Sequence, residues 1–191
     1  MKAIQWFVIA FGGLIVLVFA TLFFLGRRPG AGRVGAVVEL NAPPATAIAW
    51  LTEPAKLRRW VGYLTGVKGD TSAAVGAKQT WIMDDGRSGA LTMSVEVTAF
   101  APPDSLRRKL SVPGLMWGEN RFVLERSGSG TRLTVAGLYH HPNPMVALLE
   151  PLLTPGAQAK LDSDLARLRA QFASATDGRA GAPADTSGAT R

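Results

Sequence analysis

The sequence predicts an α+β domain, built from an antiparallel sheet and one long C-terminal helix, behind a single N-terminal transmembrane helix. Three patterns indicate this architecture. Residues 3–25 carry no charge, segments between 75 and 141 alternate apolar and polar residues between turn signals, and residues 145–173 return to helical spacing. A period of two is typical of strands, whereas apolar residues three and four positions apart are typical of helices.

The uncharged segment 3–25 is long enough to cross a bilayer. As a helix it would rise by about 34 Å, and the hydrocarbon core is about 30 Å thick. A cleaved signal peptide would have a shorter apolar core and a small-residue cleavage site, so we expect an uncleaved anchor. Only Lys2 precedes it, whereas Arg27 and Arg28 follow it. Basic flanks favour the cytoplasm, which predicts a cytoplasmic domain; a periplasmic or other extracytoplasmic location is the alternative.

The first elements of the domain follow a short linker. Residues 26–32 contain glycine, proline and alanine, a composition that favours a flexible connector. The segment 34–40 then predicts a strand. Two consecutive prolines suit the start of a short helix over 45–52, and Pro54 ends that helix and begins a second one.

From residue 75 to residue 141 the sequence predicts strands joined by short turns. The expected strands are 75–84, 88–100, 106–112, 116–126 and 131–141. Asp85-Gly86, Pro113-Gly114 and the segment 127–130 have turn composition. Strands connected this closely pair antiparallel, with one face buried and the other in water.

The last third of the chain predicts the long helix. Thr154-Pro155 has the composition of a helix start, so the helix is expected from there to about Ala173. Its buried face would be formed by Leu161, Leu165, Leu168 and Phe172. Residues 174–191 have no large apolar side chain, which predicts a disordered tail. The chain thus divides into an anchor (3–25), a linker (26–32), a domain (33–173) and a tail (174–191).

Three segments of the domain resemble a known superfamily in their residues and order. They are Leu40-Asn-Ala-Pro-Pro44 after the first strand, Ala49-Trp-Leu-Thr-Glu-Pro54 with Leu57-Arg-Arg-Trp60 in the two short helices, and Gly130-Thr-Arg-Leu-Thr-Val135 before the last helix. Together they resemble the helix-grip domains of the SRPBCC superfamily, which includes START lipid-transfer domains, polyketide cyclases and dehydrases, and plant pathogenesis-related allergens. The resemblance covers residues 33–173.

This resemblance implies a curved sheet wrapped around the long helix, with an apolar cavity between them. The inward rows would then be Trp81, Met83, Leu91, Met93, Val95, Leu110, Met116, Phe122, Leu133, Val135 and Tyr139. The same residues would also fill an ordinary packed core, and both interpretations stay open. Three methionines on these rows favour a pocket, because methionine adapts to irregular shapes.

Few polar residues stand out as candidates for chemistry. Arg108 lies in an otherwise apolar row, where it could bind a ligand carboxylate or phosphate; extension of its side chain to solvent at the sheet edge is the favoured alternative. His140 and His141 are adjacent and point to opposite faces of a strand, so they cannot chelate one metal ion. His141 shares the row of Tyr139 and could reach a cavity mouth; a capping or packing role is the favoured interpretation. Turn chemistry explains Asp84 and Asp85.

Composition excludes several function classes. The chain has no cysteine, which removes disulfides, thiolate metal sites and a cysteine nucleophile. The net charge is +7, but the basic clusters are short and lack the stripe with aromatic platforms that nucleic-acid binding requires. No Ser-His-Asp spacing, phosphate-binding glycine loop or dinucleotide motif is present. We therefore assign no catalytic residue, no metal and no cofactor, and the oligomeric state stays open.

The function predicted from these observations is a membrane-tethered module that binds a hydrophobic small molecule or lipid. Its expected partners are the bilayer, through residues 3–25, and that ligand. The candidate ligand contacts are Trp81, Met83, Met93, Arg108, Met116, Phe122, Tyr139 and His141. Two alternatives remain: a polyketide cyclase-like or dehydratase-like enzyme, and a membrane-anchored protein-interaction module with a closed core.

Overall fold

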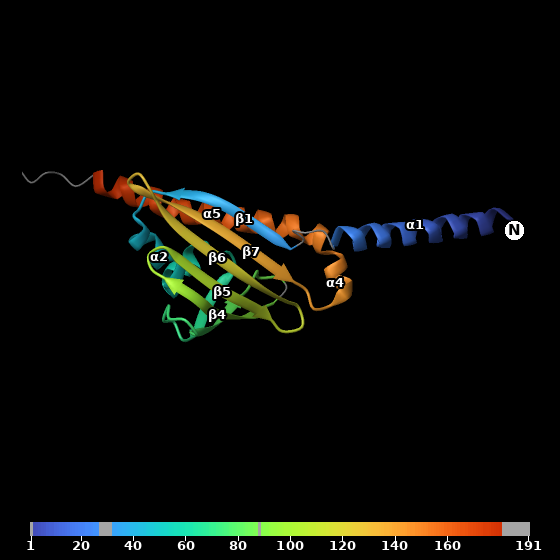
Figure 1. The fold of residues 1–191 in the computed structure, drawn as a ribbon, viewed down its shortest axis with the longest axis horizontal. Helices are drawn as coiled ribbons and strands as arrows, with labels where there is room; N and C mark the ends of the chain where they lie inside the picture. The colour runs from blue at the N-terminus through green and yellow to red at the C-terminus, as the bar shows by residue number, and fades with distance from the viewer. Residues whose placement is uncertain (1, 27–31, 88, 181–191) are drawn as a thin grey trace, which may run out of the picture.

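The structure, a computed structural model, describes residues 2–26, 32–87 and 89–180. Figure 1 shows one helix extending from a domain in which a long helix lies along a sheet. The helices are α1 (Lys2–Gly26), α2 (Pro44–Thr52), α3 (Pro54–Trp60), α4 (Pro144–Leu148) and α5 (Glu150–Ala180). The strands are β1 (Arg33–Leu40), β2 (Leu64–Gly69), β3 (Lys78–Met83), β4 (Leu91–Ala101), β5 (Ser105–Val112), β6 (Met116–Ser127) and β7 (Gly130–His140).

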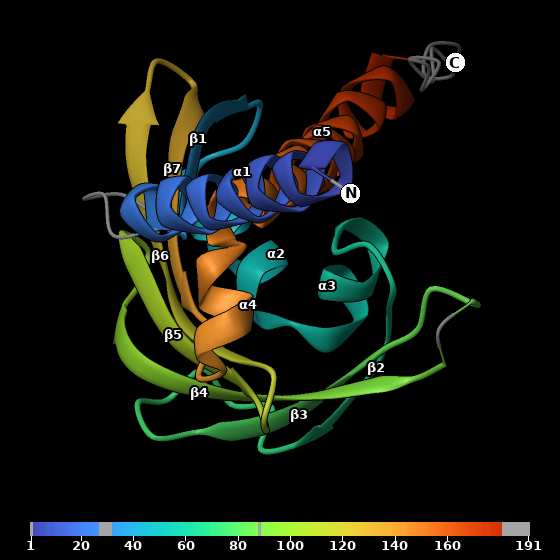
Figure 2. The same cartoon turned by 90° about the vertical axis from the view of Figure 1, so that its right-hand side faces the viewer.

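These strands form one sheet, in which every neighbouring pair is antiparallel and the order is β1-β7-β6-β5-β4-β3-β2. Strands β2 to β7 follow one another as a meander, and β1 closes the far edge beside β7. Figure 2 shows the sheet curving around the helices. The predicted α+β class is confirmed: a curved antiparallel sheet and a long C-terminal helix form a helix-grip-like fold.

The strand predictions are confirmed within three residues at each end, with one strand missing from them. Strand β2 has the sequence LTGVKG, whose glycines weaken both alternation and β-propensity. It forms because its backbone pairs with β3 at the edge of the sheet. Tertiary pairing therefore overrides a poor local signal.

The opposite edge of the sheet is covered by α5. Gln158 accepts a hydrogen bond from the Gly35 backbone N–H over 3.0 Å and donates to the Gly35 carbonyl over 3.1 Å. One amide side chain thus satisfies both backbone groups of a residue on β1. An uncovered edge of this kind would be a template for pairing with another chain.

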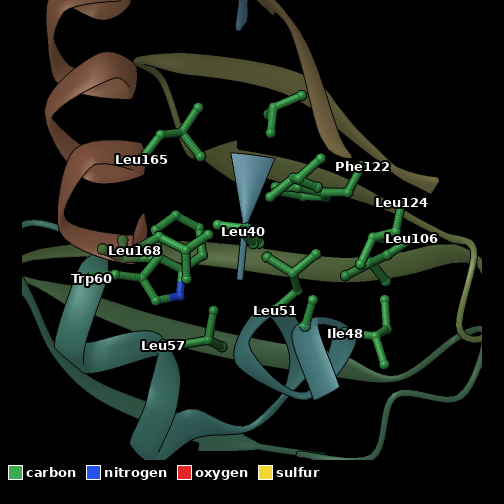
Figure 3. Packing of buried hydrophobic residues seen from close by; sticks show 14 of the residues in the cluster. Leu40, Ile48, Leu51, Leu57, Trp60, Leu106, Phe122, Leu124, Leu165 and Leu168 are labelled. Atoms are coloured by element: carbon green, nitrogen blue, oxygen red, sulfur yellow. The ribbon is translucent and has the colours of Figure 1, made fainter. Parts of the chain in front are cut away.

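The hydrophobic core lies at one end of the fold, where α2 and α3 meet the sheet and the C-terminal half of α5 (Figure 3). Leu57, Leu133 and Leu168 are fully buried there. The predicted buried face of the long helix is confirmed, since Leu165, Leu168 and Phe172 are buried and Leu161 packs partly buried against the core. Burial of a leucine contributes about 2 kcal/mol, so this end carries much of the stability.

The predicted start of the long helix is wrong. The helix α5 begins at Glu150, and the Thr154 hydroxyl donates to the Glu150 carbonyl over 2.7 Å, one turn back, instead of capping a new helix. Pro155 therefore lies inside the helix, where it lacks one backbone hydrogen bond. At its other end α5 continues to Ala180, past the expected end at Ala173. The rest of the expected tail, 181–191, and linker residues 27–31 lie outside the described residues.

Helix α1 includes one stretch long and apolar enough to cross a bilayer, Ile4–Phe24, with a mean hydropathy of 2.7. None of that stretch is buried against the rest of the protein. The helix contacts α4 and α5. The segment 3–25, predicted to be an anchor, therefore forms an apolar helix that contacts α5.

Candidate ligand-binding cavity

A cavity of about 720 Å³ lies between the inner face of the sheet and the first turns of α5. This volume falls in the range of small-molecule sites, about 300–1,000 Å³. Strands β3 to β7 supply one wall, and Leu153, Ala157 and Leu161 of α5 supply the opposite one. Along part of its length, α5 therefore does not pack directly against the sheet.

Every residue predicted as a ligand contact lines this cavity. They are Trp81, Met83, Met93, Arg108, Met116, Phe122, Tyr139 and His141. Of the other predicted inward residues, Leu91, Leu110 and Val135 also line it, whereas Val95 and Leu133 are buried in the core. The two interpretations of the inward rows, cavity and core, thus each hold for part of the sheet.

The division between core and cavity runs along α5. Its C-terminal half presents Leu165, Leu168 and Phe172 to the core, and these large side chains close the space against the sheet. Its N-terminal half presents Leu153, Thr154, Ala157 and Leu161, and the two smaller side chains, Thr154 and Ala157, leave space against the sheet. Side-chain volume along one helix therefore determines where the fold is hollow.

Arg108 is buried at the boundary between core and cavity. Its side chain is 2% exposed, so the favoured expectation that it extends to solvent at the sheet edge is wrong. Strand β5 is central in the sheet, between β4 and β6, so Arg108 on its inner face has no free sheet edge past which to extend. Nη2 donates to the Leu51 carbonyl, and the guanidinium lies 5.3 Å from the Trp81 ring and 6.0 Å from the Phe122 ring. Such distances are those of cation–π contacts.

The charge of Arg108 has no neutralising partner in the part of the chain that the structure describes. No carboxylate oxygen there lies within 4.0 Å of the guanidinium, and Nε has no hydrogen-bond partner. Burial lowers the pKa of Arg108 to about 10, because desolvation disfavours the charged form. At neutral pH the side chain therefore stays cationic within an apolar wall.

Asn120 and Tyr139 form a second polar group in the cavity. The Tyr139 hydroxyl donates to Asn120 Oδ1 over 2.9 Å, and burial raises the pKa of Tyr139, so the phenol is neutral at pH 7. Gly118 and Gly137 make room for its ring: a Cβ atom on them would lie 2.7 and 3.2 Å from ring carbons. Asn120 is the register partner of Arg108 on the adjacent strand. We call the wall formed by Trp81, Arg108, Asn120 and Phe122 the cavity floor.

His141 and Glu150 lie at the end of the cavity next to the anchor. Glu150 is buried, and its Oε1 accepts a hydrogen bond from the His141 backbone N–H over 3.3 Å. The Nδ1 atom of His141 is buried without a partner among the described residues. His141 thus lines the cavity, while its Nδ1 atom is enclosed by protein.

Charged residues occupy the rim of the cavity. Asp164 receives hydrogen bonds from Lys160 over 2.7 Å and from the Gly62 backbone over 3.1 Å, and it also pairs with Arg167. Asp84 accepts from the Gly86 backbone over 2.8 Å, which confirms its predicted turn role. The cavity wall thus combines apolar side chains with charged ones, and the charge of Asp164 is paired within the protein.

Sequence reasoning missed Asn120, Glu150 and Asp164 as cavity residues. Asn120 follows a charged residue on β6, and only the register with β5 shows that it faces inward beside Arg108. The two acids lie on α5, where they look like ordinary polar positions of an amphipathic helix. A signal for Asn120 was present, since it stands two positions before Phe122 on the predicted inward row.

Comparison with known proteins agrees with this geometry. Residues 31–173 match a family model described as polyketide cyclase/dehydrase and lipid transport. No curated protein matches the chain.

Solved structures share the fold at low identity. Protein NE0264 from Nitrosomonas europaea has a TM-score of 0.61 and 16% identity, over 77% of this chain and 97% of its own. A conserved protein from Geobacillus kaustophilus has a TM-score of 0.61 and 17% identity, over 74% of this chain and 95% of its own. DynU16, a putative protein in the dynemicin biosynthetic locus, has a TM-score of 0.54 and 20% identity, over 72% of this chain and 46% of its own. Likeness at these identities shows the fold alone.

Proposed function

Since the chain belongs to the polyketide cyclase/dehydrase and lipid transport family, we propose that its domain is a membrane-tethered module that binds one hydrophobic small molecule or lipid. The observation that carries the proposal is the cavity of about 720 Å³, lined mainly by apolar side chains, between the sheet and α5. An open apolar volume of this size is unfavourable when empty, because the residues that line it lose packing contacts. A hydrophobic ligand would restore them.

The position of the cavity relative to α1 supports a ligand that comes from the membrane. Helix α1 contacts α4 and α5, and Figure 1 shows α4 at the end of the domain from which α1 extends. Met145, Leu149 and Leu152 are exposed at this end, and exposed Leu153 lines the cavity itself. A continuous apolar path from bilayer to cavity would avoid passage of the ligand through water.

Filling the cavity tests the proposal. Ala157 and Ala159 are both exposed residues of α5, but only Ala157 lines the cavity. The full-length chain, extracted in mild detergent, is analysed by native mass spectrometry for a bound hydrophobic molecule. We expect one such molecule per chain in the wild type and in Ala159→Trp, and its loss in Ala157→Trp, where an indole group occupies the space. Absence of any bound molecule in the wild type, also after incubation with palmitate or hexadecanol, would overturn the proposal.

A cyclase-like or dehydratase-like enzyme is the second candidate, favoured by one observation. The cavity has polar groups at its floor, Arg108 and the hydrogen-bonded pair Asn120 and Tyr139, which could polarise a substrate carbonyl. DynU16 also comes from a biosynthetic locus. The neutral phenol of Tyr139 would serve as a donor and not as a base. Conversion of a bound molecule into a different product by the purified protein would support the enzyme. The third alternative, an interaction module with a closed core, has no support from a cavity of this volume.

A further inference from the structure

We propose that the cavity selects amphiphiles with an acidic head group, a carboxylate or a phosphate monoester, which binds Arg108 and Asn120 at the cavity floor while the apolar tail extends along the cavity. This assignment rests on the proposed function and names its ligand class.

The first argument is the uncompensated charge of Arg108. Arg108 is 2% exposed as a residue, and its guanidinium contacts one backbone carbonyl and two aromatic faces, none of which carries a full negative charge. Burial of a cation in an apolar wall is unfavourable unless an anion and hydrogen bonds compensate it. The guanidinium has five N–H donors in a planar fork that matches carboxylate and phosphate oxygens. A ligand anion would supply the missing partner.

The second argument is that the acidic side chains of the cavity wall are engaged elsewhere. Asp164 pairs with Lys160 and Arg167 and accepts from the Gly62 backbone, and Glu150 accepts from the His141 backbone. Asp84 and Asp85 also line the cavity, and they accept hydrogen bonds from the Gly86 and Arg87 backbone N–H groups. None of the four acids forms an ion pair with Arg108 among the described residues. The Arg108 guanidinium can therefore pair with an anionic group of a molecule that enters the cavity.

The third argument is a second donor beside Arg108. Residues 108 and 120 are register partners on β5 and β6, so their side chains lie on the same face at adjacent positions, with Cβ atoms about 5 Å apart. Tyr139 donates to Asn120 Oδ1, which directs the Asn120 amide N–H groups to other acceptors. One acidic head group has enough oxygen atoms to accept from both residues at once, and hydrogen bonds to a charged group are the stronger ones.

The apolar walls fit the tail of such an amphiphile. Beyond the floor, the cavity is bounded by Met83, Leu91 and Met93 of the sheet and by Leu153 and Leu161 of α5. The methionines adapt to tails of different shape. The tail would thus lie between the sheet and the small residues of α5, with its end toward the exposed Leu153.

The experiment compares ligands that differ only in their head group. Full-length protein in nanodiscs of dioleoyl phosphatidylcholine is labelled with photoreactive palmitate, hexadecyl phosphate or hexadecanol that carry the same diazirine, and labelled cavity peptides are quantified by mass spectrometry. Arg108→Gln removes the charge at the floor. Arg107→Gln is the matched control, since Arg107 is the adjacent residue and pairs with Glu119 on the exposed face of the sheet.

We expect the wild type and Arg107→Gln to label with at least one acidic probe about tenfold or more above hexadecanol. Arg108→Gln should lose this preference while it still labels with hexadecanol. The labelling by palmitate compared with that by hexadecyl phosphate then identifies the preferred head group. Full competition of this labelling by inorganic phosphate would show that the site binds a free anion and would overturn the amphiphile assignment.

Two results separate the failure of this inference from that of the proposed function. Equal labelling by acids and alcohol in the wild type, or an acid preference retained in Arg108→Gln, overturns the inference but leaves the cavity a ligand site. No cavity labelling by any probe overturns both. The wild-type comparison needs no variant, so it decides the question even if Arg108→Gln does not fold.

Discussion

At the scale of single residues, Arg108 differs from two other buried polar residues of the domain, Thr131 and Gln79. Thr131 is fully buried and donates to the Ala42 carbonyl over 2.6 Å, so its hydrogen bond is complete within the fold. Gln79 accepts from Trp81 Nε1 over 2.9 Å and is likewise satisfied. Arg108 instead keeps an unpartnered Nε and an unneutralised charge. Apolar replacement of Thr131 should therefore lower the free energy of unfolding of the ligand-free protein, whereas apolar replacement of Arg108 should raise it.

We predict that Arg108→Met raises the free energy of unfolding of the ligand-free protein by about 1–2 kcal/mol, because it removes an unpaired buried charge. The depressed pKa of Arg108, about 10, lies well above 7, so the charge penalty is present throughout the neutral range and is relieved only as the pH rises past that value. Thr131→Val, the comparison variant, should lower the same free energy by about 1–2 kcal/mol. Urea unfolding of delipidated full-length chain in mild detergent, followed by circular dichroism, measures both. Destabilisation by Arg108→Met would make Arg108 a structural residue.

At the scale of the elements, α5 has two functions along its length. Its apolar C-terminal half holds the sheet through the core, and its N-terminal half, with small residues, forms a cavity wall. Helical periodicity predicted the packed half correctly because Leu165, Leu168 and Phe172 recur on one face. It misplaced the start of α5 because Thr154-Pro155 has the composition of a helix start. The capping residue in this region is Asn143, which precedes the short helix α4 and accepts a hydrogen bond from the Met145 backbone N–H over 2.9 Å.

The packed half of α5 should be essential for folding. Leu165 is 4% exposed, and Leu165→Asp would place an unpaired charge between α5 and the core. We expect a loss of at least about 4 kcal/mol, from the deleted leucine and the buried carboxylate together, and no cooperative thermal transition for the domain. Ala159→Asp, on the exposed face of the same helix, should melt like the wild type. A native transition in Leu165→Asp would mean that α5 does not contact the core in the way described.

At the scale of the whole molecule, the arrangement places a hollow domain directly behind an apolar helix. Only a few residues separate α1 from β1, and α1 contacts α4 and α5 at the cavity end of the domain. Helix α2, which contributes to the core, lies at the end of the domain away from α1 (Figure 1). Trp81, Leu110 and Phe122 belong to both the core and the cavity wall, so the two regions share part of the sheet.

The side of the membrane remains a prediction from the basic residues that flank the anchor. If Arg27 and Arg28 hold the domain in the cytoplasm, a green fluorescent protein fused to the C-terminus should fluoresce and an alkaline phosphatase fusion should be inactive in a bacterial host. Both fusions should stay in the membrane fraction after carbonate extraction. The opposite pattern of reporters would place the domain outside the cytoplasm, and release by carbonate would exclude a spanning anchor.

Local sequence determined the anchor-like helix, most strands, the buried face of α5 and the inward position of the predicted ligand contacts. These depend on periodicity and turn residues, which act over a few positions. The weak strand β2, the partnership of Asn120 with Arg108 and the burial of Arg108 depend on which strands become neighbours. Strand alternation says which face a side chain takes, but only sheet order says whether that face has access to water.

The sequence by itself therefore determined the class of the fold and the residues that line its inner face, because apolar periodicity acts within each element. The tertiary structure alone decided which part of that face packs and which part stays open. That division depends on the volumes of side chains that α5 brings from far along the chain: Leu165 and Leu168 close the core, whereas Thr154 and Ala157 leave the cavity. Arg108 lies where the two meet, and its buried charge is a consequence of that position.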